Sequence, residues 1–438
     1  MEKIDCIYHA NRLSELIKIK TVSSSESYKD EFARFLSTLE QTFPKVFENA
    51  VVKNVDGSLL LCLKGKTDKK PVMFMNHYDV VEAGNGWKYS PYSGQIVDGK
   101  LWGRGTIDTK GGLYAMFEAV EELLEDGFEF ERDIYLETSA NEETTGDGAR
   151  AISKYLESQG VELHFILDEG GMIVEQPLAG TRGDFAMIGV GEKATGMVKF
   201  IAKSSGGHSS TPGKNSPLVR IAKFMVAVEN KNLFKAKIST TVCEMFRRIS
   251  RKMDSPLKIV LRHPVLFSPL LRFAMPRVSN TAGAMLKTTV AFTMAKASDG
   301  DNVIPDQAYV VANIRFSHHQ GGEESLAILK KLADKYDLIM EVVDGGDKSP
   351  VCSFKSAEFR FIESAVKEVF PTALVSPYVM TGASDCRFMG NLSKNCFRFS
   401  PFKVTNEQLA SIHGKDENVD VASLGTAVEF YKKLIKDV

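Results

Sequence analysis

Three short apolar runs that each end in polar residues constrain the fold of this chain more than any other feature. They read PVMFMNHYDV (residues 71–80), RDIYLETSANEE (132–143) and VELHFILDEGG (161–171). Between them lie stretches at 111–127 and 146–160 that have helical periodicity and end in glycine. This strand–helix–strand alternation predicts an α/β fold with a mixed, largely parallel sheet flanked by helices.

The polar ends of these runs predict a functional site. In a parallel sheet, ligands bind outside the carboxyl ends of the strands. The first run delivers His77 and Asp79 to that edge, the second delivers Glu142 and Glu143, and the third delivers Asp168. We therefore expect imidazole and carboxylate groups to gather at one edge of the sheet.

A glycine-rich stretch, LWGRGTIDTKGG (residues 101–112), places four glycines around the single carboxylate of Asp108. It fits neither nucleotide-binding pattern, because Asp108 stands where the third glycine of G-x-G-x-x-G belongs. Glycine is favoured where φ is positive or where another group approaches the backbone closely. We expect this loop to end near the same sheet edge, with its backbone close to bound metal.

The sequence pattern changes near residue 190. Runs such as TVAFTMAKA and QAYVVANIRFS alternate as half-exposed strands do, and residues 345–353 resemble a linker. We therefore expect an α/β domain built from residues 1–191 and 350–438. A smaller α+β domain, residues 192–349, is expected to be inserted into it.

The composition argues against several classes of protein. A length of 438 residues favours two domains, and a net charge of −1 gives no overall field toward nucleic acid or an anionic membrane. The six cysteines lack C-x-x-C spacing, and no stretch approaches the roughly 18 apolar residues of a membrane span. We expect a cytoplasmic protein that binds neither nucleic acid nor membrane. The basic run at 245–263 is interpreted as an exposed helix face.

The predicted cluster has the composition of a metal-assisted hydrolase. Zn²⁺ accepts imidazole and carboxylate ligands, and paired metals are bridged by oxygens. Asp79 follows His77 by two residues and can accept its imidazole N–H, which fixes the tautomer. The adjacent carboxylates Glu142 and Glu143 allow one metal ligand and one general base.

With these motifs in view, the chain resembles the co-catalytic zinc peptidases that include aminoacylases, carboxypeptidase G and succinyl-diaminopimelate desuccinylase. It is most similar to the branch of carboxypeptidase PS (Gly-X carboxypeptidase) and N-acyl amino acid hydrolases. The resemblance covers nearly the whole chain, and its motifs occur in the order MNHYDVV, DGKLWGRGTIDTKGG, NEETTG, LDEGG, GGHSSTP, NVIP, TGASDCRF and SIHGKDE.

The resemblance implies two Zn²⁺ ions per subunit, with Mn²⁺ or Co²⁺ as alternatives for such mixed ligands. The implied ligands are His77 and Asp168 for the first ion, His413 and Glu143 for the second, and Asp108 between them. The peptide bond after Asp108 is typically cis in this family. The implied fold is a phosphorylase/hydrolase-like zinc peptidase core with a ferredoxin-like domain that serves as lid and dimerisation unit.

The resemblance also implies catalytic roles outside the metal ligands. Glu142 is the expected general base, and Asp79 is expected to orient His77. His208 is expected to polarise the scissile carbonyl from the partner subunit of a homodimer.

The substrate contacts that the resemblance implies are Asn302, Arg315 and Arg387. Either arginine is a candidate for the substrate carboxylate, because a guanidinium pairs with both of its oxygens.

These features predict a dinuclear zinc amidohydrolase or metallocarboxypeptidase. Its substrates would be N-acyl amino acids or short peptides, and its product a free amino acid. A dipeptidase or aminopeptidase of the same fold is the alternative within enzymes. A non-catalytic homologue that binds metal or an amino acid is a remoter one, because neither the base nor a ligand is missing.

Overall fold

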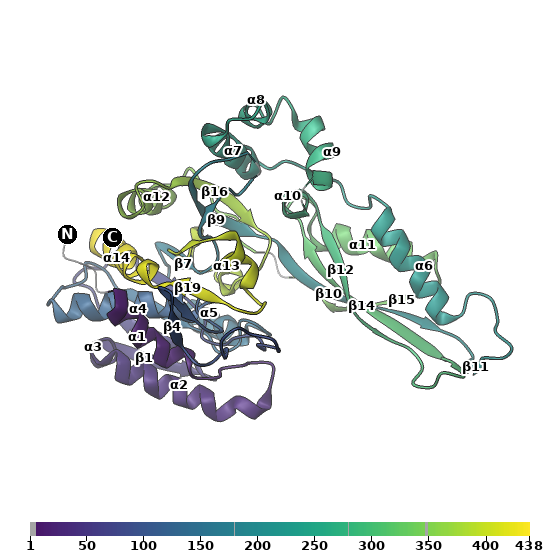
Figure 1. Cartoon of the computed structure of the whole chain (residues 1–438), viewed down its shortest axis with the longest axis horizontal. Helices are drawn as coiled ribbons and strands as arrows, with labels where there is room; N and C mark the ends of the chain where they lie inside the picture. Colours follow the sequence, from purple (N-terminus) through teal and green to yellow (C-terminus); the bar gives the residue numbers. More distant parts are fainter. Residues whose placement is uncertain (1–5, 179, 279, 347–348) are drawn as a thin grey trace.

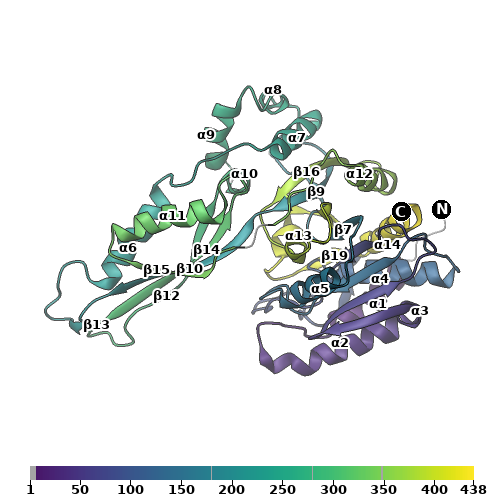
Figure 2. The ribbon, with the colours of Figure 1, turned by 180° about the vertical axis from the view of Figure 1, so that it is seen from behind.

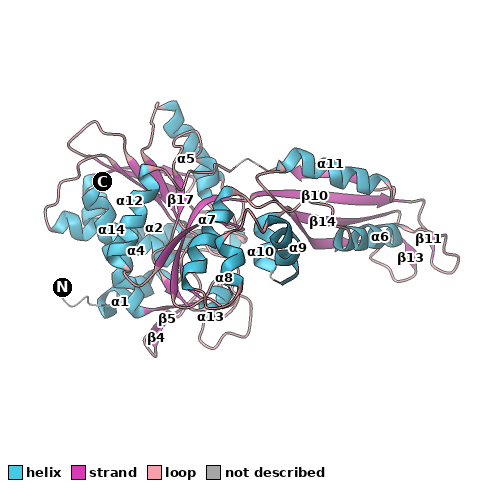
Figure 3. Cartoon of the chain, turned by 90° about the horizontal axis from the view of Figure 1, so that it is seen from above, coloured by secondary structure: helices cyan, strands magenta, loops and turns pink. Residues whose placement is uncertain are grey.

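The computed structural model describes residues 6–178, 180–278, 280–346 and 349–438, and forms two lobes (Figure 1). The larger lobe contains a mixed sheet between helices, and the smaller lobe contains an antiparallel sheet. Seen from above, the strands of the smaller lobe extend away from the larger one (Figure 3). Part of the linker predicted at 345–353 lies outside the described residues.

The large sheet has parallel strands at its centre. Its strands are β1 (Ala50–Val55), β2 (Ser58–Leu63), β3 (Val72–Met75), β6 (Ile134–Thr138), β7 (Phe165–Asp168), β8 (Ile173–Glu175), β9 (Asp184–Glu192), β16 (Leu374–Met380), β17 (Cys396–Arg398) and β18 (Lys403–Val404). They run in the order β1-β2-β6-β3-β7-β17-β9-β8-β18, with β16 beside β9. Strand β3 pairs in parallel with β6 and with β7. The three predicted strands therefore do end at one edge.

Several helices cover this sheet, including the two that the sequence periodicity predicted at 111–127 and 146–160. They are α1 (Cys6–Ile17), η1 (Glu26–Tyr28), α2 (Lys29–Thr42), α3 (Pro44–Asn49), α4 (Lys110–Glu125), α5 (Asp147–Ser158), α12 (Ala357–Val369), η3 (Asp385–Phe388), α13 (Asn406–Ser411) and α14 (Val421–Asp437). Helix α4 packs between the sheet and α1, α3 and α14, so almost all of its residues are buried.

One buried residue of α4 is Glu118, whose carboxylate lies 3.3 Å from the guanidinium of Arg12. Burial raises the pKa of Glu118 to about 7.

The smaller lobe has the predicted α+β composition. It contains β10 (Ala194–Lys203), α6 (Pro217–Asn230), β12 (Thr289–Lys296), β14 (Gln307–Phe316), α11 (Gly321–Asp334) and β15 (Ile339–Asp344), in the βαββαβ order of ferredoxin-like folds. The sheet order is β12-β14-β10-β15, and α6 and α11 pack on it through a core that includes Phe200, Phe224 and Leu329. A two-stranded ribbon, β11 (Gly207–His208) with β13 (Val303–Ile304), lies at its outer end (Figure 2). The domain boundaries remain a prediction.

Between α6 and β12 the chain leaves the small sheet and forms what we call the helical segment, residues 240–286. It comprises α7 (Thr240–Ile249), η2 (Ser250–Lys252), α8 (Leu257–Arg262), α9 (Ser268–Val278) and α10 (Asn280–Leu286). Its buried side chains share a core with Phe185 and Met187 of β9, so it packs on the large sheet. The interpretation of 245–263 as an exposed helix face is wrong in part, because Met245, Phe246 and Leu261 are buried in this core.

A single residue joins strand β9 of the large sheet to strand β10 of the small sheet. Strand β9 ends at Glu192 and β10 begins at Ala194, so only Lys193 separates them. The buried ammonium of Lys193 donates hydrogen bonds to the carbonyls of Ala284 and Lys287, at 3.0 and 2.9 Å. Burial lowers the pKa of Lys193 to about 7. These hydrogen bonds connect the residue between β9 and β10 to the end of α10 and to the residues that lead into β12.

A third sheet determines where the glycine-rich stretch (residues 101–112) lies. Its strands are β4 (Gln95–Val97), β5 (Lys100–Trp102) and β19 (Asn418–Asp420), and β5 pairs with both of the others. The loop that follows β5 therefore lies beside the residues that precede β19. None of the helices in the described part of the chain is long and apolar enough to cross a membrane.

Candidate active site

Asp79 organises the residues that follow β3 and β6. Its two carboxylate oxygens accept hydrogen bonds from the backbone amides of Glu142 and Glu143, each at 3.1 Å. The same carboxylate lies 3.3 Å from Nδ1 of His77, and all of these side chains are buried or nearly so. The backbone carbonyl oxygen of Asp79 lies closer to the same Nδ1, at 3.0 Å. Asp79 thus orients the imidazole with its main chain and side chain, and its carboxylate holds the backbone of the glutamate pair.

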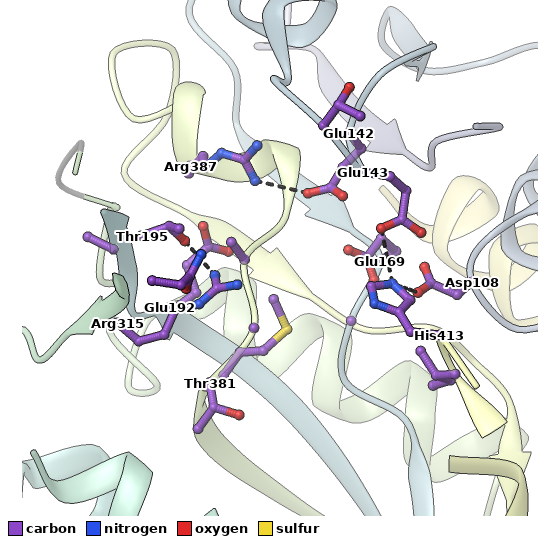
Figure 4. A pocket seen from close by; sticks show the side chains of 18 of the residues that line it. Asp108, Glu142, Glu143, Glu169, Glu192, Thr195, Arg315, Thr381, Arg387 and His413 are labelled. Carbon is purple, nitrogen blue, oxygen red and sulfur yellow. Dashed lines mark hydrogen bonds and ion pairs between the residues drawn. The ribbon is translucent and has the colours of Figure 1, made fainter. Parts of the chain in front are cut away.

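Asp108 lies between two imidazoles. Its Oδ1 is 3.1 Å from Nε2 of His77, and its Oδ2 is 3.1 Å from Nε2 of His413. The His413 nitrogen is also 3.0 Å from Oε2 of Glu143, so these groups form one cluster (Figure 4). Hydrogen bonds that His413 donates to the carboxylates of Asp108 and Glu143 raise its pKa to about 10. Each oxygen of Asp108 faces a different histidine, as a carboxylate that bridges two cations requires.

The loop that carries Asp108 is held by Glu417, which the sequence reasoning assigned no role. Glu417 is fully buried, and its Oε1 accepts hydrogen bonds from the amides of Ile107 and Asp108, at 2.8 and 3.1 Å. Its Oε2 accepts from the Gly105 amide at 3.1 Å and from the Arg104 guanidinium at 2.6 Å. Burial raises the pKa of Glu417, and Arg104 opposes that rise. Glu417 therefore fixes the backbone from which Asp108 projects.

The glycines of this loop make room for other parts of the protein. A Cβ at Gly111 would lie 2.2 Å from the Thr106 carbonyl oxygen, and one at Gly112 would lie 2.2 Å from Oδ1 of Asn76. Gly105 has a φ of +93°, which favours glycine. The peptide bond between Asp108 and Thr109 is cis, as the family resemblance implied.

The donor set suits divalent cations. The candidate ligand atoms of His77, Asp108 and Glu143 lie within 4.8 Å of one another. Burial and then the charge of Asp385 raise the pKa of Glu142 to about 8, and burial and the charge of Asp108 raise the pKa of Glu143. Carboxylates crowded in this way disfavour their charged forms unless a cation lies among them. Imidazole nitrogen and carboxylate oxygen are ligands that Zn²⁺ accepts.

The structure separates the two acids of the LDEGG motif. The carboxylate of Asp168 accepts hydrogen bonds from the amides of Glu169 and Cys386, at 2.8 and 2.7 Å. Glu169 instead lines the cavity with Asp108 and His413 (Figure 4). Burial raises its pKa, and the charges of Asp168 and Asp108 add to that rise. Asp168 ends β7 and Glu169 lies in the bend that follows, and of this pair only Glu169 lines the cavity.

A cavity of about 680 Å³ joins this cluster to the smaller lobe. Arg315 of β14 and Arg387 of η3 both line it (Figure 4). Arg387 donates a hydrogen bond from Nη1 to Oε1 of Glu142 at 2.9 Å, whereas Arg315 bonds to Thr195 of β10. The apolar lining of the cavity includes Met172, Tyr378, Met380, Leu409 and Ile412.

Two expected site residues lie away from this cavity. His208 is in β11 and Asn302 directly precedes β13, at the outer end of the smaller lobe (Figure 1). Both are exposed. The Nδ1 of His208 accepts a hydrogen bond from the Ser210 amide at 3.1 Å, and the Asn302 carbonyl accepts one from the Ser209 amide at 3.0 Å. Within this one subunit, they do not join the other candidates.

Comparison with known proteins gives the family. A profile of the Peptidase family M20/M25/M40 matches residues 73–437. The chain belongs to this family. It is 32% identical to the "Probable carboxypeptidase S-like 2" of Dictyostelium discoideum, over 98% of this chain and 84% of that protein. It is 31% identical to the human "N-fatty-acyl-amino acid synthase/hydrolase PM20D1", over 97% of this chain and 86% of that protein.

A solved structure agrees with the fold. The M20 family metallo-carboxypeptidase Sso-CP2 of Sulfolobus solfataricus superimposes with a TM-score of 0.71 at 18% identity. The alignment covers 99% of this chain and 98% of that one. Family membership makes this chain a metal-dependent hydrolase of the M20/M25/M40 peptidases, as the sequence predicted.

Proposed function

We propose that this enzyme hydrolyses the amide bond of an N-acyl amino acid or the last peptide bond of a short peptide, which releases a free amino acid. The observation that carries the proposal is a single cavity with the imidazole–carboxylate cluster on one side and two guanidinium groups on the other. The cluster suits hydrolysis of an amide, and a guanidinium suits a terminal carboxylate. The names of the carboxypeptidase S-like and N-fatty-acyl-amino acid hydrolase relatives support the same substrates.

Two Zn²⁺ ions are part of this proposal, with Mn²⁺ or Co²⁺ as alternatives. We assign them to His77, Asp108, Glu143, His413 and Glu169. Glu169 takes the place expected for the preceding aspartate, whose oxygens are occupied by backbone amides. When bound, such ions acidify water and polarise the substrate carbonyl.

Glu142 moves the proton in this mechanism. Its carboxylate lies at the cavity wall beside the metal ligands and accepts a hydrogen bond from Arg387. It takes a proton from the attacking water and returns it to the leaving nitrogen. Its position suits both steps, because it lies beside the proposed metal ligands and Arg387 holds one of its oxygens at the cavity wall.

Arg315 binds the substrate carboxylate in our proposal. Arg387 is already engaged by Glu142, whereas the partner of Arg315 is the neutral hydroxyl of Thr195. A planar guanidinium can pair with both carboxylate oxygens, which fixes the direction of the substrate. The opposite end of the substrate then reaches the apolar lining that includes Leu409 and Ile412.

We further propose a cytoplasmic homodimer that associates through the smaller lobe. All six cysteines are free thiols, which suits a reducing compartment. The exposed position of His208, away from the cavity of its own subunit, suits a role in the other active site. Mixing His208→Ala subunits with Glu142→Gln subunits should then restore activity, because one composite site has both groups intact. Heterodimers that form without recovery would exclude a shared site.

The substrate proposal is tested with a panel of N-acyl amino acids and blocked dipeptides, with and without a chelator. Release of free amino acid that stops on chelation supports it. Comparing an N-acetylated dipeptide with the same dipeptide without the acetyl group distinguishes the proposed activity from the alternative, since an aminopeptidase or dipeptidase requires the free amine. Hydrolysis of the unblocked dipeptide alone would replace the proposal with that activity.

A further inference from the structure

The helical segment exposes a group of large apolar side chains. These are Leu257, Ile259, Val265, Leu266, Leu270 and Phe273. At 75%, Leu266 is the most exposed large apolar side chain in the described part of the chain. It lies with Val265 in the turn between α8 and α9, at the outer edge of the molecule (Figure 1).

On α9 this exposure is confined to the side that faces away from the shared core. On α9, Leu271 and Met275 are buried in the core shared with β9, whereas Leu270 and Phe273 are exposed. Leu261 of α8 is also buried in that core. The outward side of a surface helix ordinarily carries charged or polar residues. Here the helices bury one apolar side in the protein and present another to the outside.

The exposed apolar side chains are interleaved with cations. Residues 255–298 contain no aspartate or glutamate. Lys258, Arg262, Arg272 and Arg277 are exposed, and none forms an ion pair with another described residue. The Arg277 guanidinium lies 3.8 Å from the centre of the Phe273 ring. The net charge of −1 for the whole chain averages over this local excess of positive charge.

We propose that residues 255–278 form a docking surface for an anionic lipid bilayer. Apolar side chains beside lysine and arginine are the pattern of segments that lie in the membrane interface. The six apolar side chains would enter the boundary between headgroups and acyl chains, while the four cations face anionic headgroups. Each cation near such a surface contributes roughly fivefold to the affinity.

Charge favours a bilayer over a second copy of this chain. A two-fold symmetric contact buries the same patch of both subunits, so these cations would face their own equivalents. Like charges brought together in this way oppose association. Nucleic acid would satisfy the cations, but it offers no apolar layer for Val265 and Leu266. A bilayer supplies both negative charge and an apolar interior.

The test is co-sedimentation of the full chain with vesicles. One set contains phosphatidylcholine with phosphatidylserine, and the other contains phosphatidylcholine alone. The proposal predicts binding to the first set that weakens with added salt, and much weaker binding to the second. Absence of binding to the phosphatidylserine vesicles, or equal binding to both sets, overturns it.

Matched variants locate the binding surface. Val265→Ser should weaken binding about tenfold, because its apolar side chain no longer enters the interface. Lys258→Glu should weaken it by about fivefold or more. The controls are Val51→Ser on β1, whose 66% exposure equals that of Val265, and Lys394→Glu at another exposed lysine. Neither control should alter binding.

Melting temperature and hydrolysis of a water-soluble substrate check that each variant is folded. If Val265→Ser lowers the melting temperature, Leu270→Ser tests the same surface from α9. Unchanged vesicle binding in the apolar and charge variants alike overturns the proposal. Self-association that is lost in these variants, with vesicle binding retained, would instead identify a contact between copies. Binding that the controls weaken equally would also reject this surface.

Discussion

Replacing Glu417 with glutamine tests whether a residue outside the proposed metal ligands builds the site. The substitution preserves the size of the side chain but removes its charge, and it turns one acceptor oxygen into a donor. Arg104 then loses its ion-pair partner at a position where both side chains are at most 1% exposed. Breaking a buried pair on one side costs about 3–5 kcal/mol. Up to two of the three loop amides that Glu417 binds lose their acceptor as well.

We expect Glu417→Gln to lower the free energy of unfolding of the metal-free enzyme by about 4 kcal/mol. We also expect metal affinity to fall about 10- to 100-fold, because the backbone of Asp108 is no longer fixed. Urea unfolding and titration with a competing chelator measure the two effects. The control is Glu429→Gln at an exposed position, which should stay within about 0.5 kcal/mol of the parent.

A second variant separates the ion pair from the loop. In Arg104→Met/Glu417→Gln neither partner is left as an unpaired buried charge, so the double variant should be less destabilised than the sum of the single variants. The metal affinity should remain low, since the loop amides still lack their carboxylate. Near-parental stability and metal affinity in Glu417→Gln would refute the reasoning.

Three further predictions follow from the described contacts. Glu142→Gln should lower kcat about 10²- to 10⁴-fold while metal content, measured by atomic absorption, stays unchanged; retained turnover would reject the base assignment. Glu169→Gln should reduce metal content far more than Asp168→Asn, and the reverse order would return the ligand role to the aspartate. Because burial raises the folded-state pKa of Glu118 to about 7, the folded protein keeps this proton at pH values where the unfolded chain has lost it. The free energy of unfolding should therefore rise as the pH falls from about 7 toward 4.5. Protonation of Glu118 accounts for about 2.5 kcal/mol of the gain between pH 8 and pH 5, and Glu118→Gln should abolish that part. Urea unfolding at the two pH values measures it, and an unchanged pH dependence in the variant would count against the assignment.

The arrangement of the central sheet could be predicted because its cause is local. A buried parallel strand requires a short apolar run, and the chain places polar residues directly after such runs. This pattern predicted that the residues following β3 and β6 would meet, and the structure brings His77, Asp79, Glu142 and Glu143 together. The resemblance to a family added His413, which lies in a loop with no periodicity of its own.

Other features depend on distant contacts that the sequence does not encode locally. Glu417 reaches Asp108 across 309 residues of chain, and nothing near either residue indicates the pairing. The pair Asp168 and Glu169 could not be resolved either, because both follow the same apolar run and only the backbone direction decides which faces the cluster. The packing of the helical segment on β9 was missed because its apolar residues also fit a helix of the smaller lobe.

Only Lys193 separates β9 from β10, so the backbone angle at this residue determines where the far end of β10 lies. Strand β10 has 10 residues, so at about 3.3 Å per residue it extends roughly 33 Å from its pivot at Lys193. A rotation of about 10° at that pivot would carry the far end of a strand of this length by roughly 6 Å. That distance is about two hydrogen-bond lengths. The outer ribbon with His208 is therefore far more sensitive to the angle at Lys193 than Arg315, whose partner Thr195 lies at the near end of β10.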